Sequence, residues 1–441
     1  MSLSALNRPV LPSTNTDASE VKQFRESAQT VRRYYVLLLV LMVLISTLHF
    51  ALPNHAENIH SLTISRRIGY TFNADSALYA WTVITFPRGL ATETGSIRRG
   101  RPLYPAFGWA VYQALHLMRW FVPRDLADKG ATLARQSNTG AMWRNIDGQQ
   151  IVLAWVALII VNLLISGTAL LLIFHALRAI FEPRLALLLT LIPAVHSDAI
   201  DFYLVPHTEP FNLLIPALFL CALAAWPIGR SGIEWSLPLG VSMLAKLMPF
   251  MVPNWLLEWV ALNRSSAAGN RRSRARLVAA GAIMILLPTI FFVILLHIFR
   301  VPVYNYEAIQ YRMFVWMLDA ARAHHPATIF VRVISGLVEY LRVTAIAFAV
   351  PLAACVVMLA APTRRHFRLA GRMWLHLLVY SCSCAMFWAC SGYIWKRLTI
   401  TEFPVVIYAF GCLSMSRWKR PEWIVCAAVI GTIITRVFGV Y

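Results

Sequence analysis

The segment IVLAWVALIIVNLLISGTALLLIFHAL, residues 151–177, contains no Asp, Glu, Lys or Arg. As a helix it is long enough to cross the roughly 30 Å apolar core of a bilayer. Similar apolar runs recur along all 441 residues, which are 59% hydrophobic and 14% charged, with a mean hydropathy of +0.61. Soluble domains carry about 25% charged residues. The sequence therefore predicts an all-α polytopic membrane protein.

Charge and cysteine content argue against two other classes of protein. The formal net charge is +20, but the basic clusters stand at the ends of apolar runs, as the positive-inside rule and attraction to anionic lipids predict. We therefore expect membrane lipids, and no nucleic acid, as partners. The seven cysteines lie in or beside apolar runs without a CxxC pair, so we interpret them as packing residues rather than disulfides or metal ligands.

The basic clusters also predict orientation. Four basic residues within 22–33 precede the first apolar run, 34–52, which places the N-terminus in the cytoplasm. Alternation from there gives about 11 transmembrane helices with every strongly basic loop on one side. A shorter, arginine-flanked segment, 104–122, is expected to lie on the outer surface as a juxtamembrane helix. Segment 235–262 carries Lys246 and three prolines, and is expected to be a broken pair of helices whose treatment changes the count by two.

These assignments divide the chain into three parts. A cytoplasmic tail (1–33) precedes a first transmembrane module (34–262) that includes an outer loop at 54–149. The remaining transmembrane helices (263–441) include a second outer loop at 300–332. The sequence shows no internal repeat, so it gives no sign of an inverted-repeat transporter.

Several cations lie on the outer side, where the positive-inside rule disfavours them. Three come from SIRRGRPLYP, residues 96–105, and others follow in later outer segments. Phosphate groups of a ligand would explain such cations. Pairing with lipid head groups, or with Glu93 and Glu402, is the alternative explanation and stays open. The cations are Arg98, Arg99, Arg101, Arg312, Lys396 and Arg397.

A single carboxylate, Asp75, lies on the same side in FNADSALYAW, residues 72–81. In a helix, Tyr79 would lie one turn further along the same face. A carboxylate at the interface close to cations suits a general base that faces a polar acceptor. The alternative is that Asp75 caps the N-terminus of a helix over 76–84.

The order of these motifs resembles the bacterial GT-C glycosyltransferases, which are membrane enzymes that use polyprenyl-phosphate-linked sugars. The shared features are Asp75-x-x-x-Tyr79, the Arg-Pro-Leu-Tyr-Pro of 101–105, the outer acidic stretch VPHTEPFNLL with Glu209, and the lysine of LGVSMLAKLMP. The resemblance covers about residues 70–260. Position 75 lacks the tandem acidic pair of many family members, and Glu209 stands where Asp is commoner. A divalent cation is therefore neither required nor excluded.

The residues and the resemblance together imply a site on the periplasmic face of a bacterial inner membrane. Asp75 would be the catalytic base of an inverting transfer from a polyprenyl-phosphate sugar to a hydroxyl of a lipid, a glycan or a surface protein such as a pilin. Cations would bind the donor phosphate: Arg98, Arg99, Arg101, Lys246, Lys396 and Arg397. Substrate contacts would come from Tyr79, Tyr104, His196, Asp198, His207, Glu209, Tyr306 and Arg312.

Two alternatives remain from the sequence. A secondary transporter or flippase for an anionic solute or lipid would also need buried charges, of which only Lys246 is placed deep enough. A metal site at His196 and His207, which flank Asp198, Asp201 and Glu209, lacks a fixed ligand spacing, so no metal ligand is assigned.

Overall fold

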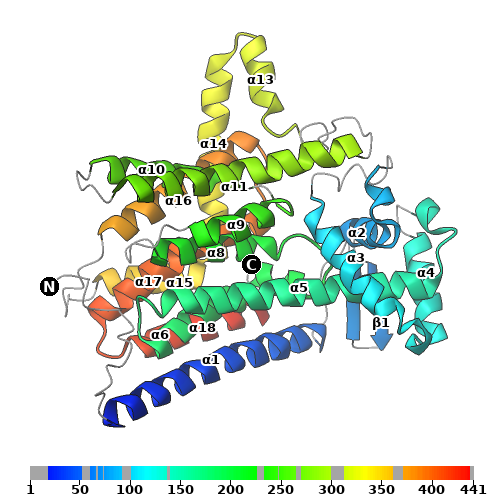
Figure 1. Ribbon diagram of the computed structural model, residues 1–441, viewed down its shortest axis with the longest axis horizontal. Helices are drawn as coiled ribbons and strands as arrows, with labels where there is room; N and C mark the ends of the chain where they lie inside the picture. The colour runs from blue at the N-terminus through cyan, green and yellow to red at the C-terminus, as the bar shows by residue number, and fades with distance from the viewer. Residues whose placement is uncertain are drawn as a thin grey trace.

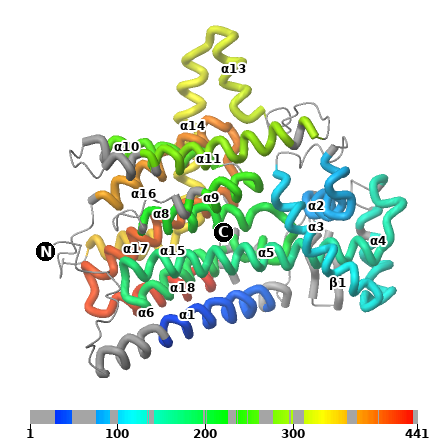
Figure 2. The backbone as a smooth tube through the Cα atoms, in the orientation of Figure 1, coloured from blue at the N-terminus to red at the C-terminus, as the bar shows by residue number. Residues whose placement is uncertain are grey.

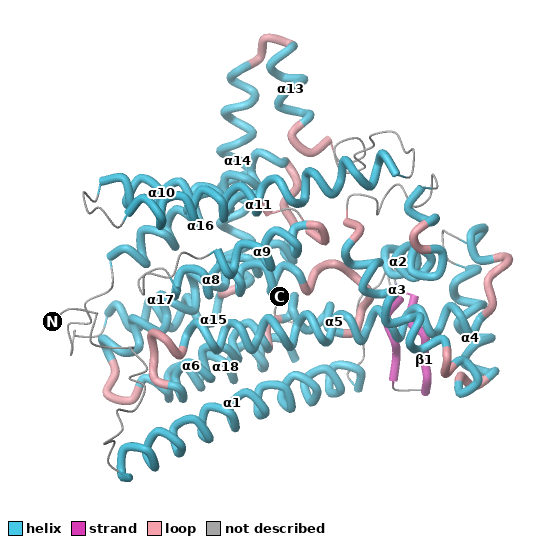
Figure 3. Tube along the Cα trace, in the orientation of Figure 1, coloured by secondary structure: helices cyan, strands magenta, loops and turns pink. Residues whose placement is uncertain are grey.

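The computed structural model describes residues 18–51, 60–65, 68–72, 74–91, 101–136, 140–225, 233–246, 248–264, 270–298, 312–360 and 371–437, and the structural statements below concern these residues. They fold almost entirely into helices (Figure 3). The elements up to residue 225 are α1 (Ala18–Ala51), β1 (His60–Ser65), β2 (Ile68–Phe72), α2 (Ala74–Thr85), η2 (Arg88–Ala91), α3 (Leu103–His116), η4 (Arg119–Phe121), α4 (Arg124–Gln136), η5 (Gly140–Trp143), α5 (Gly148–Leu177), α6 (Pro183–Ala194), α7 (Ser197–Tyr203) and α8 (Phe211–Ala225).

The second half of the chain is also helical. Its elements are α9 (Ile233–Met243), η7 (Pro249–Met251), α10 (Val252–Arg264), α11 (Asn270–Ile298), α13 (Val315–Arg322), α14 (Pro326–Ala347), α15 (Ala349–Ala360), α16 (Gly371–Ser391), η8 (Lys396–Glu402), α17 (Phe403–Arg417) and α18 (Pro421–Val437).

Helix α5 forms the centre of the molecule. Over its most apolar stretch, 56% of its residues are buried, against 17% for α1 and 22% for the apolar part of α11. It packs against α8, α3, α4, α2 and α6, and Figure 2 shows it between α1 and α11. Helices α2, α3 and α4 gather with the β-hairpin at one end of α5, on the right in Figure 1. The outer loop expected at 54–149 therefore forms a small module on the N-terminal half of α5.

Within the part of the chain that the structure describes, five helices are long and apolar enough to cross a membrane: Gln29–Thr47, Gly148–Leu177, Leu277–Ile294, Arg372–Ser391 and Arg397–Arg417. The bent pair of α14 and α15 adds a sixth if it is counted as one span. This is the architecture of a helical membrane protein, but these helices do not reach the expected count of about 11. Three of the expected spans form helices of only 12, 15 and 17 residues, namely α6, α8 and α18.

The broken pair expected at 235–262 is present. Helix α9 ends at Met243, residues 244–246 form a turn, and α10 begins at Val252. Lys246 therefore lies at the break between two helices, where backbone carbonyls are not all used within a helix.

Two features differ from the sequence-based expectations. The expected span over 340–361 is bent by 87° between α14 and α15. Pro351, in the first turn of α15, lacks the N–H that would bond to the Ala347 carbonyl, so it cannot continue a straight helix. Helices α13 and α14 form a hairpin that projects at the top of Figure 1, within and beyond the expected outer loop 300–332.

The second difference is a two-stranded antiparallel sheet in a chain expected to be all-α. Strand β1 pairs with β2 in a register that sets His60 opposite Phe72, with an irregularity between Thr63 and Ser65. The strand sequences HSLTIS and IGYTF are rich in β-branched and aromatic residues, which favour strands.

Candidate functional site

A polar cluster forms where four segments distant in sequence meet: the start of α2, the segment 204–210 between α7 and α8, the turn after α9, and η8. Arg101, just before the N-cap residue Pro102 of α3, and Asn212, in the first turn of α8, complete it. The cluster consists of Asp75, Arg101, His207, Thr208, Glu209, Asn212, Lys246 and Arg397. Six of the residues predicted from the sequence to act in catalysis or in substrate or phosphate binding are in this set, and Tyr79 and Tyr104 pack beside it.

Asp75 is the second residue of α2, so it lies within the helix rather than at its N-cap. Its Oδ2 lies 2.7 Å from Nε2 of His207, which donates the hydrogen bond. The two side chains differ sharply in exposure, at 35% for Asp75 and 1% for His207. The carboxylate is therefore reachable from outside and is held from the buried side by an imidazole.

Glu209 is the buried centre of the cluster. Its Oε2 accepts a hydrogen bond from Lys246 Nζ at 2.7 Å, and Arg397 Nε lies 3.3 Å from Oε1. The Asn212 amide also donates to Oε2 and to the Arg397 carbonyl oxygen. Since Glu209 and Lys246 are 4% and 7% exposed, two cations compensate one carboxylate away from water.

Two tyrosines and an arginine form the edge of the cluster on the side of α2 and α3. The Arg101 guanidinium donates to the Thr208 hydroxyl at 3.0 Å, and the Tyr79 hydroxyl lies 3.5 Å from the same oxygen. The buried rings of Tyr79 and Tyr104 meet edge to face, with centroids 4.8 Å apart. Thr208 therefore links the Arg-Pro-Leu-Tyr-Pro segment to the acidic segment.

The backbone of the acidic segment is fixed from two sides. Asn162 of α5 donates its side-chain amide to the carbonyls of Phe202 and Val205, at 3.0 and 2.6 Å. The Ser76 hydroxyl of α2 donates to the Pro206 carbonyl at 3.1 Å. These hydrogen bonds are made to backbone carbonyls that have no partner within a helix. They hold His207 in position opposite Asp75.

Burial and charge set the protonation of the two central groups. Burial lowers the pKa of His207 below its ordinary value, although the hydrogen bond and the charge of Asp75 oppose that effect. Burial would raise the pKa of Glu209, but Lys246 and Arg397 together lower that pKa to about 2. At neutral pH His207 is thus neutral and Glu209 is ionised.

The charges of the cluster do not cancel. Three cations, Arg101, Lys246 and Arg397, face two carboxylates, Asp75 and Glu209, so the net charge is +1 with His207 neutral. The side chain of Arg397 is 28% exposed, and besides Glu209 it contacts the Tyr393 hydroxyl at 3.2 Å and the Trp395 ring at 5.5 Å. The reachable groups therefore include a carboxylate and a guanidinium, which could face a hydroxyl and an anion respectively.

The remaining predicted residues lie elsewhere or outside the described residues. Arg98, Arg99 and Tyr306 are outside the described residues, and for Asp198 and Lys396 the structure describes the backbone alone. His196 is buried and its Nε2 lies 2.8 Å from the Ala347 carbonyl, with its ring beside Phe348. Arg312 is exposed and pairs with Asp319. His196 therefore contacts the bend between α14 and α15, and Arg312 pairs with a residue of α13.

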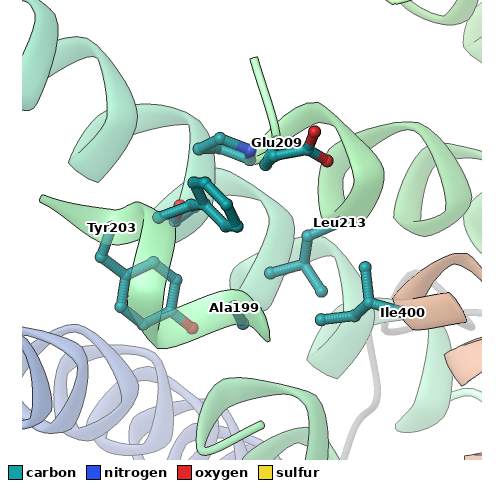
Figure 4. A pocket seen from close by; sticks show the side chains of 8 residues that line it. Ala199, Tyr203, Glu209, Leu213 and Ile400 are labelled. Atoms are coloured by element: carbon teal, nitrogen blue, oxygen red, sulfur yellow. The ribbon is translucent and has the colours of Figure 1, made fainter. Parts of the chain in front are cut away.

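A small hollow lies beside Glu209, with a cavity volume of about 10 Å³ (Figure 4). Its lining is mainly apolar: Ser166, Ala199, Phe202, Tyr203, Glu209, Pro210, Leu213 and Ile400. Ligand pockets usually have volumes of about 300–1,000 Å³. This hollow is too small for a sugar, and most of the side chains that line it beside Glu209 are apolar.

The cluster as arranged does not fit a divalent cation. Asp75 and His207 are in direct hydrogen-bond contact, and the oxygens of Glu209 are taken by Lys246, Arg397 and Asn212. Within the described residues no group of three or more His, Cys, Asp or Glu side chains could hold a metal ion. The seven cysteines are all free thiols.

Three contributors to the site were not predicted: Thr208, Asn212 and Asn162. Thr208 and Asn212 lie within the VPHTEPFNLL stretch, but nothing in their spacing distinguishes them from other polar residues there. Asn162 is different, because it is an isolated amide in the long apolar segment 151–177. Polar residues inside apolar spans usually face the protein and are functional, so this signal could have been used.

No protein-family model and no curated protein matches this sequence. Among solved structures, the chain is similar to the Archaeoglobus fulgidus oligosaccharyltransferase, solved in complex with zinc and sulfate, at 14% identity and a TM-score of 0.48. The alignment covers 91% of this chain and 52% of that protein, so this chain spans about half its length.

Proposed function

We propose that this protein is an inverting glycosyltransferase that moves a sugar from a polyprenyl-phosphate donor to an acceptor hydroxyl at the periplasmic face of a bacterial inner membrane. The observation that carries the proposal is a half-exposed carboxylate, Asp75, held by a buried neutral imidazole beside a cluster of net positive charge. Asp75, Arg101, His207, Glu209 and Lys246 lie in the motifs on which the resemblance to GT-C glycosyltransferases rests, whereas Arg397 lies outside the part of the chain that the resemblance covers. A lipid-linked donor suits a catalytic face where nucleotide sugars are absent.

In the proposed reaction Asp75 accepts the proton of the acceptor hydroxyl while the hydroxyl oxygen attacks the anomeric carbon. The bond between that carbon and the phosphate oxygen breaks on the opposite face, so the configuration inverts. The polyprenyl phosphate leaves as a monoester and gains negative charge. Stabilising charge that develops in the transition state is usually the largest contribution to catalysis.

We propose that Arg397 and Arg101 stabilise the negative charge of the leaving phosphate, and their contacts within the cluster support this assignment. Arg397 is partly exposed and its planar guanidinium is fixed by Glu209, Tyr393 and Trp395. Arg101 is fixed by Thr208. Lys246 is fully paired with Glu209 inside the cluster, so we propose that it keeps Glu209 ionised and holds the arginine in place. Arg98, Arg99 and Lys396 remain proposed phosphate ligands.

The test is transfer of radiolabelled sugar from synthetic polyprenyl-phosphate donors to acceptors in a membrane extract, with the purified protein in nanodiscs. Asp75→Asn keeps the shape of the side chain but removes the base, so the rate should fall by about 10²–10⁴-fold. The matched control is Asp128→Asn, an exposed carboxylate of α4 outside the cluster, which should retain normal turnover. Near-normal turnover of Asp75→Asn would reject the base.

A second arm of the same experiment separates transfer from transport. If proteoliposomes take up the donor or a free anionic solute and no product forms in nanodiscs, the secondary transporter or flippase is the correct function. The charges of the cluster would then serve a substrate that passes through without reacting.

A further inference from the structure

The hydrogen bond between His207 and Asp75 joins a buried side chain to an accessible one. Burial leaves His207 neutral at pH 7, so the ring carries one N–H. The 2.7 Å contact with an ionised carboxylate places that hydrogen on Nε2. Nδ1 then carries a lone pair, and it has no hydrogen-bond partner among the residues that the structure describes; Glu209 Oε1 lies 3.5 Å from it.

The chain fixes this imidazole with several contacts. The Tyr79 ring meets it edge to face at 6.1 Å, and the Phe202 ring lies 5.2 Å away. Its backbone belongs to the segment held by Asn162 and Ser76. A side chain so restricted can orient its partner, since His207 is 1% exposed and Asp75 is 35% exposed.

We infer that His207 is the positioning residue of Asp75, whose Nε2–H holds one carboxylate oxygen and thereby orients the base toward the acceptor hydroxyl. This inference rests on the proposed glycosyl transfer. The imidazole contacts the carboxylate directly, so the proposed base is a carboxylate paired with an imidazole.

The pair predicts a specific pH behaviour. A hydrogen bond donated to the charged form of Asp75 favours that form, and so does the nearby Arg397 guanidinium. Glu209 faces His207 from the other side, and Arg397 lies close enough to both to act on them. Without the Nε2–H donor, Asp75 would take up a proton at higher pH. The acid limb of the rate profile, where the transfer rate falls with decreasing pH, would then lie at higher pH.

The experiment compares His207→Asn, His207→Gln and the unmodified protein by the pH dependence of kcat and KM for transfer. Asn is too short to reach Asp75, so its acid limb should rise by about one to two pH units. Its plateau kcat should fall by up to about 100-fold because the base is misplaced, with little change in donor KM. Gln can present an N–H close to the Nε2 position, so it should restore the acid limb to within about half a pH unit.

The matched control is His376→Asn. His376 is also buried and also contacts a carboxylate, Glu258, at 3.2 Å, but it lies between α16 and α10. This variant should leave the acid limb unmoved. If His207→Asn and His207→Gln lose activity equally and neither moves the limb, His207 is only a packing residue and the inference is wrong.

A measurement without catalysis keeps the two proposals separate. Nitrogen NMR of ¹⁵N-histidine-labelled protein in nanodiscs, with the His207 signal identified by its loss in His207→Gln, reports which ring nitrogen carries the proton. We expect the Nε2–H form, and a mixture of both forms in Asp75→Ala. A proton on Nδ1 in the unmodified protein would overturn the inference even if transfer is observed. Absence of transfer from every donor would reject the proposed function, while the NMR result would still decide the pairing.

Discussion

Replacing Lys246 by Met should destabilise the protein by about 3 kcal/mol. The substitution keeps the length of the apolar stem but leaves Glu209, 4% exposed, without its closest cation. Lys246 is one of the groups that hold the pKa of Glu209 at about 2, together with Arg397 and His207, whereas burial lowers the pKa of Lys246 itself to about 8. The geometry of the buried pair, with 2.7 Å between Lys246 Nζ and Glu209 Oε2, is therefore the better guide to the cost. Breaking a buried ion pair generally costs about 3–5 kcal/mol. Because Arg397 still lies 3.3 Å from Glu209, we expect the lower end of that range.

The structure also predicts how this loss is reversed. In Lys246→Met combined with Glu209→Gln no buried carboxylate remains uncompensated, so the double variant should be more stable than Lys246→Met alone. The coupling energy should reach about 2 kcal/mol, as expected for residues in direct contact. Lys129→Met, at an exposed lysine of α4, is the control and should change stability by less than about 0.5 kcal/mol.

The assay is equilibrium unfolding in mixed micelles by titration with a denaturing detergent, followed by tryptophan fluorescence. A loss of 3 kcal/mol lowers the ratio of folded to unfolded protein by roughly 150-fold. If the two substitutions add to within about 0.5 kcal/mol, Glu209 and Lys246 are not coupled and the buried cluster is described wrongly. If Lys246→Met is as stable as the unmodified protein, Glu209 is reached by water.

Two more predictions concern packing and acid stability. Gly148→Ala should cost about 1–3 kcal/mol, because the new Cβ would clash with the backbone oxygen of Ala127 in α4. Gly281→Ala is the control in the same unfolding assay: the nearest atom to its new Cβ is a side-chain carbon at 3.6 Å, and Ala favours a helix interior over Gly, so this variant should lose no stability. Because the pKa of Glu209 is lowered on folding, its contribution to stability is complete above about pH 4.5 and is lost as the pH falls toward 2; the unfolding free energy should decrease over this range, and by less in Glu209→Gln.

The sequence was informative about the charged members of the site because charge is rare in this chain. Asp75, Glu209 and Lys246 are each isolated near apolar segments, and Arg397 follows Lys396 in a short polar stretch between two such segments; an ionisable group there needs a reason. Their convergence could not be predicted, since it depends on how α2 packs on α5 and how α9 and η8 pack on α8. Arg312 has an equally conspicuous place in the sequence, yet it pairs with Asp319 on α13. Position in the sequence alone does not distinguish a charged residue that joins the site from one that pairs elsewhere.

The fold was predictable to the extent that it follows from hydrophobicity. Helices α5, α11 and α16 coincide with expected spans because a continuous apolar run leaves the backbone no other way to satisfy its hydrogen bonds in lipid. The β-hairpin over 60–72 was missed because two short strands in a polar stretch give no comparable signal. The 87° bend before α15 depends on Pro351, whose effect on direction is set by the neighbouring packing.

The separation of the ion cluster along the chain has a consequence for biosynthesis. Lys246 follows Glu209 by 37 residues, so this pair can form early, while the ribosome is still making the second half. Arg397 and the rest of η8 are synthesised much later. Until they pack against the cluster, Glu209 has only one of its two cations, and the side of the cluster that η8 forms is missing beside Asp75. A nascent chain stalled before residue 397 would therefore hold the Lys246–Glu209 pair without the guanidinium that completes the cluster. Such a chain should be a substrate for membrane quality control, and it would lack the arginine that we propose to face the donor phosphate.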